Sequence, residues 1–504
     1  MVDPVTVIGS GPNGLVAAAL LARAGVPVEV LEQHPTRAGG AVGSAALTRP
    51  GFVHDVGAAF FPFARISPAF RALDLEGAGL QWARAAVDSA HPSLDGTTAA
   101  LSGDDAQTAA SLGVDADAWR RLVGWHRKVE AKLVPALIGP LPGLMDKLRV
   151  NPLDLLRFSR VALRSGAGFS RSFFQAEPAR RVLPALALHV DLGPEDALSA
   201  ALGYMLGLLA VTQGNLVPRG GAQAVADALV HRLTEAGGRL TLGTRVDRIV
   251  LRNQRAVAVR LTNGEERPCQ AVLADTDAAA LYLRLLADAP LASRVRRRMT
   301  HFPRGWGTFK VDWALDAPVP WASEAARQAA VVHAGDSLED LIRFTREVRA
   351  GQLPGNPYLV MGQQSLVDPS RAPAGQHTLW AYSRVPTDLE GGWPQHAQAF
   401  ADAVEARIEG LAPGFRQHIL DRRISAPPDL EAGNPNLVGG DLGGGTNQWR
   451  NLLIFRPVFP YFRHRTPVKG VYLASSYAHP GAGAHGMCGF GAAQVALRDL
   501  QRRG

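Results

Sequence analysis

The chain has 504 residues, of which 47% are hydrophobic and 19% are charged. This balance is typical of a folded protein and excludes a disordered one, and the length predicts two or three domains. The net charge is +8, but the basic residues are scattered and no nucleic-acid motif is present, so we expect no nucleic-acid partner. The only cysteines are Cys269 and Cys488, which excludes a disulfide framework, a C-x-x-C redox motif and a cysteine metal site.

Two features of the sequence bear on location. No uncharged apolar run reaches the roughly 18 residues that a membrane-spanning helix needs, and the longest candidate, Leu198 to Val211, fits a buried helix better. The first apolar strand begins at Val5, which leaves no room for a signal or transit peptide. We therefore expect a cytoplasmic protein with no metal site.

The stretch VTVIGSGPNGL near the start of the chain predicts a nucleotide site. Val5 to Ile8 is a short, apolar, β-branched run of the kind that forms a buried parallel strand. In the G-x-G-x-x-G that follows, the first glycine allows a tight turn, the second lets the backbone approach a pyrophosphate, and the third lets helix and strand pack closely. The residues expected at the pyrophosphate are Gly9, Gly11, Pro12, Asn13 and Gly14.

The residues after this turn complete a dinucleotide-binding unit. Leu15 to Ala24 is rich in strong helix formers, and a second apolar strand, Val28 to Leu31, leads into Glu32 and Gln33. Glu32 lies 18 positions after Gly14, close to the roughly 20-residue offset at which a carboxylate binds a ribose hydroxyl. The glycine pattern alone can arise by chance among 53 glycines, and the alternative is an ordinary βαβ corner. The ordered series of strand, turn, helix, strand and acid favours the dinucleotide site.

A second glycine-rich turn, PTRAGGAVG at residues 35–43, follows this unit. Gly39 and Gly40 would let the backbone come close to a ligand, and a plain loop is the alternative. From about residue 84 to 214 the pattern becomes helical, with apolar positions at helical spacing. The clearest of these helices are Trp119 to Leu137, Pro152 to Arg164 and Pro178 to Leu188.

The segment from Leu144 to Leu163 is both amphipathic and basic. One interpretation is a solvated helix that packs on the core. The other is a helix that rests on a membrane surface, which would make the protein a peripheral membrane protein. The sequence leaves both open.

The second half of the chain returns to alternating strands and helices. Residues 215–277 predict a helix, a glycine stop and strands, with a hairpin turn at Asn263-Gly264. Residues 290–435 mix strands and helices. A buried strand, Val471 to Ser475, precedes the last helix, Gly486 to Arg503.

The last strand and helix are joined by a second G-x-G-x-x-G, formed by Gly481, Gly483 and Gly486. Only 18 residues follow it, too few for another dinucleotide-binding unit. A glycine turn at a helix N-terminus suits an electron-rich group. We therefore expect this turn to face the reactive end of the same cofactor. FAD fits, because its reduced ring is anionic, whereas NAD would not need the end of the chain.

Several of these segments resemble one family. VTVIGSGPNGL, RAGGA at 37–41, PRGGAQAVADAL and GVYLASSYAHPGAGAHGMCGFGAAQVAL at 470–497 resemble the FAD-dependent phytoene desaturase-related oxidoreductases of the flavin amine oxidase superfamily. The similarity extends to the branch of pyridine nucleotide-disulphide oxidoreductase domain-containing protein two. It covers nearly the whole chain and is weakest through residues 90–210.

The resemblance implies an α/β fold in which a Rossmann-like, glutathione-reductase-like FAD-binding domain is assembled from non-contiguous segments. These segments are residues 1–83, 214–289 and 436–504. The intervening residues 84–213 and 290–435 would form a mixed α+β substrate-binding domain with a helical part.

The resemblance also implies which residues bind non-covalent FAD. Glu32 would bind the adenosine ribose, and Val246 would meet the adenine through its backbone. Gly39, Gly40 and Ala41 would approach the ribityl chain or the isoalloxazine ring. The turn from His485 through Gly486 to Met487 would meet the pyrimidine edge of the flavin. Where many relatives have a Gly-Asp pair, this chain has Ser475 and Ser476, so a hydroxyl or backbone contact must substitute.

The expected reaction is desaturation, dehydrogenation or isomerisation of a hydrophobic, polyene or isoprenoid substrate, with hydride transfer to flavin N5 and electrons passed to dioxygen or a quinone. His485 is the candidate proton acceptor, and a histidine that only caps the glycine turn is the alternative. His479 and Tyr477 are weaker candidates, and Lys310 is expected to be a surface lysine rather than a base near the flavin.

Two further interpretations stay open, a flavin amine oxidase and a low-turnover flavoprotein with a binding or regulatory role. The aromatic residues Phe60 and Phe61 and those of segment 302–313 would line an apolar tunnel or belong to the core.

Overall fold

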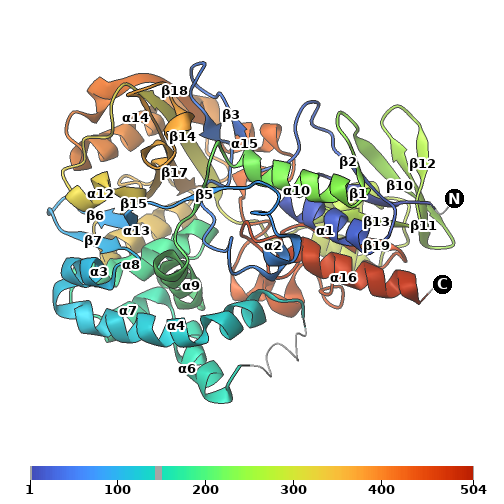
Figure 1. Ribbon diagram of the computed structural model, residues 1–504, viewed down its shortest axis with the longest axis horizontal. Coiled ribbons are helices and arrows are strands. Elements are labelled where there is room, and N and C mark those ends of the chain that lie inside the picture. Colours follow the sequence, from blue (N-terminus) through green and yellow to red (C-terminus); the bar gives the residue numbers. More distant parts are fainter. Residues whose placement is uncertain (1–2, 142–149, 503–504) are drawn as a thin grey trace.

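The chain forms two lobes side by side, each built around its own β-sheet (Figure 1). The structure is a computed structural model that describes residues 3–141 and 150–502. One lobe holds both ends of the described chain, and the other holds most of the helices (Figure 1).

The first lobe contains a five-stranded parallel sheet. Its order is β19 (Val471–Leu473), β13 (Ala271–Ala274), β1 (Val5–Ile8), β2 (Val28–Leu31) and β9 (Arg239–Thr241). Strands from the beginning, the middle and the end of the chain therefore share one sheet. The expected Rossmann-like α/β fold is confirmed.

Different layers cover the two faces of this sheet. Alternate residues of β1 and β13 point into two separate apolar cores, as the two-residue period of a strand requires. One core packs against α1 (Pro12–Arg23), α10 (Gln223–Glu235) and α16 (Met487–Gln501). The other packs against an antiparallel sheet of β10 (Val246–Arg252), β11 (Arg255–Leu261) and β12 (Glu266–Pro268). The hairpin predicted at Asn263-Gly264 joins β11 to β12.

The second lobe is organised around a seven-stranded mixed sheet. Its order is β18 (Ile419–Ser425), β14 (Gly307–Leu315), β17 (His377–Val385), β16 (Leu359–Gly362), β15 (Ala329–Ala334), β6 (Val87–Pro92) and β7 (Thr98–Leu101). All neighbours are antiparallel except β15 and β6. α14 (Trp393–Leu411) covers one face, and α13 (Leu338–Arg349) and α8 (Glu177–Ala187) cover the other.

The helical part of this lobe matches the sequence analysis closely. Its helices are α3 (Asp105–Leu112), α4 (Ala116–Ile138), α6 (Pro152–Ala162), α7 (Gly166–Phe173), α8 and α9 (Ser199–Thr212). The apolar run from Leu198 forms the buried helix α9, as predicted. Residues 144–149 of the predicted amphipathic segment lie outside the described residues. Over 3–141 and 150–502, no helix has the length and apolarity that crossing a bilayer requires.

Short elements connect these layers. They are β3 (Ser44–Ala45), β4 (His54–Asp55), α2 (Pro68–Leu73), β5 (Trp82–Ala83), β8 (Val217–Pro218), α11 (Ser293–Thr300), α12 (Glu324–Arg327) and α15 (Pro427–Gly433). A single π-helical turn, Ala280–Leu285, follows β13.

Candidate cofactor and substrate site

The turn between β1 and α1 presents unpaired backbone amides. Gly11 is the N-cap of α1, and neither a capping side chain nor an acidic residue occupies the first turn of the helix. The Gly14 amide donates to Asp275 Oδ2 at 2.8 Å. Within the described chain, the amides of Gly11 and Asn13 have no hydrogen-bond acceptor. Free amides at a helix N-terminus are the donors that bind a phosphate, so this turn fits the expected pyrophosphate.

The carboxylate of Glu32 is fixed at the end of β2. Its Oε2 accepts hydrogen bonds from the Ser10 amide at 2.8 Å and the Ser10 hydroxyl at 2.7 Å, and its Oε1 accepts from the His34 amide at 2.7 Å. Glu32 is buried, whereas Gln33 beside it is exposed. These bonds hold an acid next to the glycine turn, and its contact with a ribose stays a prediction.

The second glycine turn lies directly against the first. A Cβ on Gly40 would lie 3.3 Å from the Gly11 Cα, so the two backbones are in contact. Gly39 has a φ of +113°, and a Cβ there would lie 2.1 Å from the Val42 carbonyl oxygen, so only glycine fits. Across the described residues, the amides of Gly40 and Ala41 have no acceptor. The turn thus presents bare backbone where the sequence predicts a ligand.

The N-terminus of α16 lies beside that of α1. A Cβ on Gly489 would lie 1.9 Å from the Asn13 carbonyl oxygen, which puts the two helices in backbone contact. The Gly489 amide also points at Asn13 Oδ1, 3.4 Å away. The glycine turn at 481–486 therefore adjoins the first turn, as the single-cofactor interpretation requires.

His485 is held inside this turn as a neutral imidazole. Its Nδ1 accepts a hydrogen bond from the Met487 amide at 3.1 Å, and the Ser67 hydroxyl donates to its carbonyl oxygen at 2.6 Å. Burial lowers the pKa of His485 to about 4. These contacts are those of the capping histidine considered above, and a part in proton transfer stays a prediction.

The other predicted residues of the last segment make contacts within the protein. The Ser475 hydroxyl donates to the Thr276 carbonyl oxygen at 2.6 Å. Tyr477 donates to the Asn436 carbonyl oxygen at 2.7 Å, and His479 Nε2 lies 3.1 Å from the Gly139 carbonyl oxygen.

Val246 begins β10 in the first lobe. It packs in the apolar core that also contains Ile8 and Leu31, the last residues of β1 and β2. The Thr244 amide, two residues before Val246, donates to the Glu32 carbonyl oxygen at 2.7 Å. Val246 therefore lies near the carboxyl edge of the parallel sheet, where dinucleotides bind in this fold class.

Lys310 is buried, so the expectation of a surface lysine is wrong. Only 6% of the residue is exposed, and its Nζ donates to Asp312 Oδ2 at 2.6 Å and to the Asp55 carbonyl oxygen at 3.1 Å. Asp312 lies two residues further along β14, on the same face of the strand, and offsets the charge. The i, i+2 pair in FKVDW was the signal that could have revealed this.

Four aromatic side chains belong to, or pack against, one apolar cluster on a face of the seven-stranded sheet. We call Phe60, Trp306, Trp380 and Tyr382 the aromatic group. The Trp380 and Tyr382 rings are parallel with centres 5.9 Å apart, and Phe60 lies 5.8 Å from Trp380. All except Trp380 are half-buried.

Other aromatic residues named in the sequence analysis belong to apolar cores. Phe61, Phe302, Phe309 and Trp313 are buried there. For these four residues the core alternative is therefore confirmed.

A chain of imidazoles beside this group was not predicted from the sequence; His91 and His333 in it are buried, and His189 is half-buried. His189 Nε2 lies 2.8 Å from His333 Nε2, and Ser89 Oγ lies 3.0 Å from both His333 Nδ1 and His91 Nε2. Burial lowers the pKa of His91 and of His189 to about 3, so both are neutral near pH 7. The His189 ring centre is 6.1 Å from that of Tyr382. Three separate chain segments contribute, so no local motif could signal the chain.

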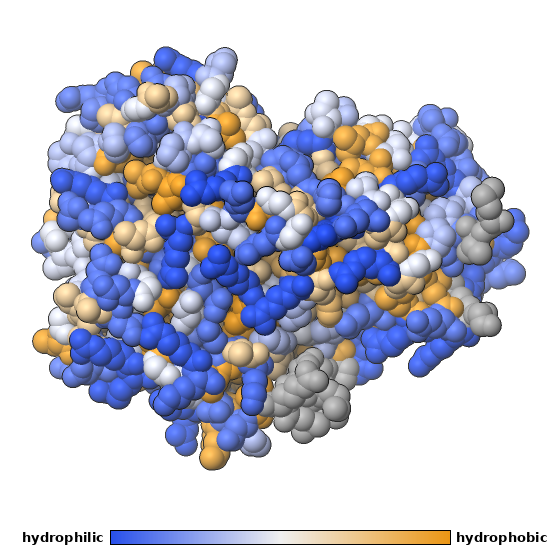
Figure 2. Space-filling model, in the orientation of Figure 1, coloured by the Kyte–Doolittle hydropathy of each residue, from blue (hydrophilic) through white to orange (hydrophobic). Residues whose placement is uncertain are grey.

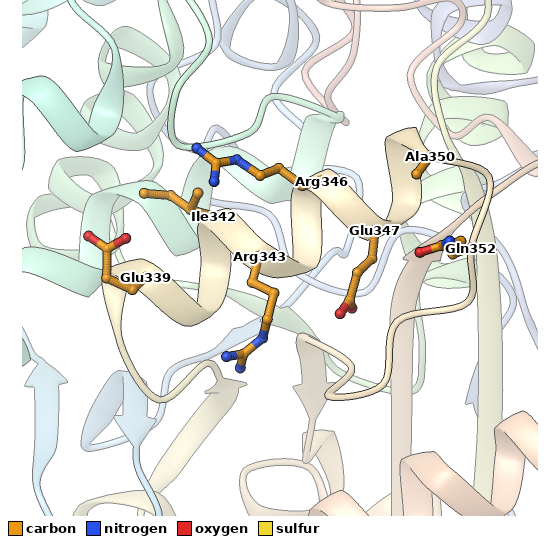
Figure 3. Close-up of a pocket in the computed structure, with 7 residues that line it drawn as sticks. All are labelled: Glu339, Ile342, Arg343, Arg346, Glu347, Ala350 and Gln352. Atoms are coloured by element: carbon orange, nitrogen blue, oxygen red, sulfur yellow. The ribbon is translucent and has the colours of Figure 1, made fainter.

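A separate surface hollow of about 530 Å³ runs along α13 (Figure 3). Its lining is charged, and Arg346 pairs with Glu195 while Arg343 pairs with Asp340. The lining residues are Glu339, Ile342, Arg343, Arg346, Glu347, Ala350 and Gln352. None of them is a predicted site residue.

Two adjoining helix N-termini, two bare glycine turns and a buried acid define a dinucleotide-binding α/β protein. The chain belongs to the family of flavin-containing amine oxidoreductases, whose family model matches residues 13–389. The protein is therefore an FAD-dependent oxidoreductase, as expected from the sequence.

Two relatives and one solved structure illustrate the similarity. The chain is 28% identical to pyridine nucleotide-disulfide oxidoreductase domain-containing protein 2 of Mus musculus, over 98% of this chain and 93% of that protein. It is 26% identical to the neurosporene-forming phytoene desaturase of Rhodobacter capsulatus, over 79% of this chain and 75% of that one. Wild-type putrescine oxidase bound to putrescine has the same fold, with a TM-score of 0.60, 18% identity and 100% of both chains covered.

Proposed function

We propose that the protein desaturates, dehydrogenates or isomerises a hydrophobic substrate of polyene or isoprenoid type. When bound, the flavin supplies a two-electron acceptor at N5, and dioxygen or a quinone is the final acceptor. The proposal includes the division into an FAD-binding domain (1–83, 214–289, 436–504) and a substrate-binding domain (84–213, 290–435).

In this proposal the chain's own residues hold the cofactor mainly through backbone. The free amides of Gly11 and Asn13 bind the pyrophosphate, and Glu32 binds the ribose. The amides of Gly40 and Ala41 bind further along the cofactor. The remaining proposed contacts are Gly9, Pro12, Gly14, Gln33, Gly39, Val246, Ser475, Gly486 and Met487.

The proposed substrate class rests on the charges around the aromatic group. The guanidinium carbon of Arg384 lies 5.4 Å from the Tyr382 ring centre, and that of Arg349 lies 5.4 Å from the Trp306 ring centre. Arginines of the protein thus already occupy the cation-binding faces of these two rings. Arg349 is paired with Asp196, so the positive charge that a cationic amine would meet here is chiefly that of Arg384, whereas an uncharged hydrocarbon needs only the apolar surface. This arrangement favours a hydrophobic substrate over an amine.

Anaerobic reduction of the bound flavin tests the proposal. Phytoene in detergent micelles should bleach the oxidised flavin spectrum, and putrescine at equal concentration should leave it unchanged. Bleaching by putrescine alone would support an amine oxidase and contradict the proposal. If neither compound nor a panel of isoprenoid hydrocarbons reduces the flavin while dithionite does, the low-turnover role is favoured instead.

We also propose that α6 makes the peripheral membrane contact. Leu153, Leu156 and Leu163 are 72%, 51% and 71% exposed, and Arg157 and Arg160 are exposed on the same helix. Hydrophobic residues lie at the lower tip of the molecule, where Figure 1 places α6 (Figure 2). Apolar side chains flanked by arginines suit a bilayer with anionic headgroups.

Vesicle co-sedimentation tests this contact. The protein should bind phosphatidylglycerol vesicles more tightly than phosphatidylcholine vesicles. A double change, Leu153→Ser with Leu156→Ser, should weaken binding by about tenfold or more, because each leucine contributes on the order of 1 kcal/mol when it inserts. Val114→Ser is the matched control, since Val114 is 70% exposed in the turn between α3 and α4. Equal binding by all forms would refute the contact.

A further inference from the structure

A buried carboxyl group lies directly beneath the pyrophosphate turn. Asp275 follows β13, is 6% exposed, and accepts the Gly14 amide at 2.8 Å through Oδ2. A Cβ on Gly11 would lie 2.4 Å from that oxygen, and one on Gly14 would lie 3.0 Å from it. Two of the three motif glycines are therefore needed to make room for this carboxyl, in addition to any role toward a ligand.

No positive charge compensates Asp275. Among residues 3–141 and 150–502 it forms no ion pair, and its Oδ1 has no hydrogen-bond partner. A second carboxylate, Glu32, is bonded to Ser10 of the same turn. A bound pyrophosphate would bring further negative charge to a turn that already lies between two acids.

Five other titratable or charged groups lie around the turn. Burial lowers the pKa of His485 to about 4 and raises that of the Cys488 thiol on α16 to about 12, so neither changes charge near pH 7. Asp277, two residues beyond Asp275, pairs with Arg304. His34 and Arg37 lie beyond Glu32, where His34 Nδ1 accepts the Arg37 amide at 3.2 Å.

We propose that Asp275 is a positioning residue that takes up one proton from solvent when FAD binds, so that the pyrophosphate meets a neutral carboxyl group. This rests on the proposed placement of the pyrophosphate at the turn from Gly9 to Gly14. A protonated carboxyl can still accept the Gly14 amide through one oxygen while its hydroxyl is free to donate. Because the carboxyl group is neutral after the uptake, Asp275 adds no third negative charge to those of Glu32 and the pyrophosphate.

The sign of the pH dependence follows from the two states of the carboxyl. Burial, with the nearby Glu32 charge, already raises the pKa of Asp275 to about 7 before FAD binds. An adjacent dianion raises this pKa further. Below about pH 6 both states are protonated and affinity is independent of pH, whereas above about pH 7 the dissociation constant should rise by about tenfold per pH unit.

The dissociation constant of FAD, measured across pH, tests the inference. The holoprotein is diluted in buffers from about pH 5.5 to about pH 9, and released FAD is followed by its fluorescence. We expect a plot of log Kd against pH with a slope near zero at the acid end and near one above about pH 7. A flat plot in the wild-type protein would overturn the proposal without any variant.

Three substitutions show which residue takes up the proton when FAD binds. Asp275→Asn keeps an acceptor for the Gly14 amide and a donor, but it cannot titrate, so it should bind FAD with little pH dependence. Glu29→Gln is the matched control, since Glu29 on β2 bonds to Arg267 and Thr241 rather than to the turn, and it should retain the wild-type slope. Loss of the slope in His34→Gln with retention in Asp275→Asn would assign the proton to His34 and refute the proposal.

Competition by ADP separates this inference from the placement of the cofactor. ADP carries the adenine half and a pyrophosphate, so it should displace FAD if the placement is right. Failure of ADP to compete while FAD binds would contradict the placement itself. Competition by ADP together with a flat plot would leave the placement standing and reject only the role of Asp275.

Discussion

For a buried side chain, the presence of an oppositely charged partner decides whether it carries charge. Lys310 and Asp312 are both buried, and they form an ion pair at 2.6 Å. His485 has no carboxylate partner, and its Nδ1 contacts the Met487 amide instead. Desolvation then favours the neutral imidazole, which can accept a hydrogen bond where an imidazolium could not. The same degree of burial therefore leaves one group charged and the other neutral.

Substitution of His485 separates its capping role from a role in proton transfer. His485→Ala leaves the Met487 amide without its acceptor in a buried position, which should cost about 1–3 kcal/mol of unfolding free energy and reduce the bound flavin. His485→Asn supplies another acceptor and should recover much of both. The measurements are urea unfolding, the flavin-to-protein absorbance ratio and the rate of anaerobic flavin reduction by phytoene. If His485→Asn is stable and flavin-loaded but reduced at least tenfold more slowly, the proton-accepting role is supported. An unchanged rate would leave only the cap.

At the scale of elements, the contact between α1 and α16 joins the two ends of the chain at the cofactor. Asn13 and Gly489 meet through backbone atoms because position 489 carries no side chain. α1 begins at the pyrophosphate turn, and α16 begins at the glycine turn of residues 481–486. Their close packing therefore sets the distance between the two halves of the proposed cofactor site.

Adding one methyl group at this contact should destabilise the protein and weaken FAD binding. The Cβ of Gly489→Ala would lie 1.9 Å from the Asn13 carbonyl oxygen, and such overpacking costs about 1–3 kcal/mol or more. Gly124→Ala on α4 is the control, because a Cβ at Gly124 meets nothing within 4 Å. That change should stabilise the helix by about 0.5–1 kcal/mol. Thermal unfolding and FAD titration measure both, and equal effects of the two variants would contradict the packing argument.

Local elements could be predicted from the sequence, and non-local pairings could not. α1, α4, α6, α8, α9 and α10 follow from apolar periodicity and glycine stops within single segments. The parallel pairing of β6 with β15 joins Val87 to Ala329, and no short-range pattern encodes such a register. Strands and helices in residues 290–435 could therefore be predicted, but not the seven-stranded sheet that β6 and β7 complete.

The same limit applies to the site when the whole molecule is considered. The glycine turns and Glu32 are visible because a motif encodes them in consecutive residues. Asp275 meets Gly14 across 261 positions, and the imidazole chain brings His189 within 2.8 Å of His333. Folding alone creates these contacts, and it also withdraws several histidines from water.

The buried histidines predict how the whole molecule responds to acid. Burial lowers the pKa of His54, His464 and His485 to about 4, that of His91, His189 and His479 to about 3, and that of His333 well below its ordinary value. Unfolding exposes these imidazoles, which then bind protons below about pH 6.5. Their stabilising contribution is therefore complete above that pH and is lost as the pH falls toward 4.

The acid response should be steep because the histidines outnumber the opposing groups. Each imidazole that is protonated only on unfolding lowers the unfolding free energy by about 1.4 kcal/mol for every unit by which the pH falls below about 6.5. Three buried carboxyls act in the opposite sense, since burial raises the pKa of Asp88 above its ordinary value, that of Asp191 to about 6 and that of Asp275 to about 7, but they offset only part of the effect. Total stabilities are about 5–15 kcal/mol, so we expect urea unfolding to become markedly easier as the pH falls from about 7.5 to about 5.

His54→Gln should reduce the slope of the unfolding free energy against pH by about one proton, whereas His231→Gln, at an exposed position on α10, should leave it unchanged. An unfolding free energy that stays constant over this range would show that these imidazoles do not remain neutral in the folded protein.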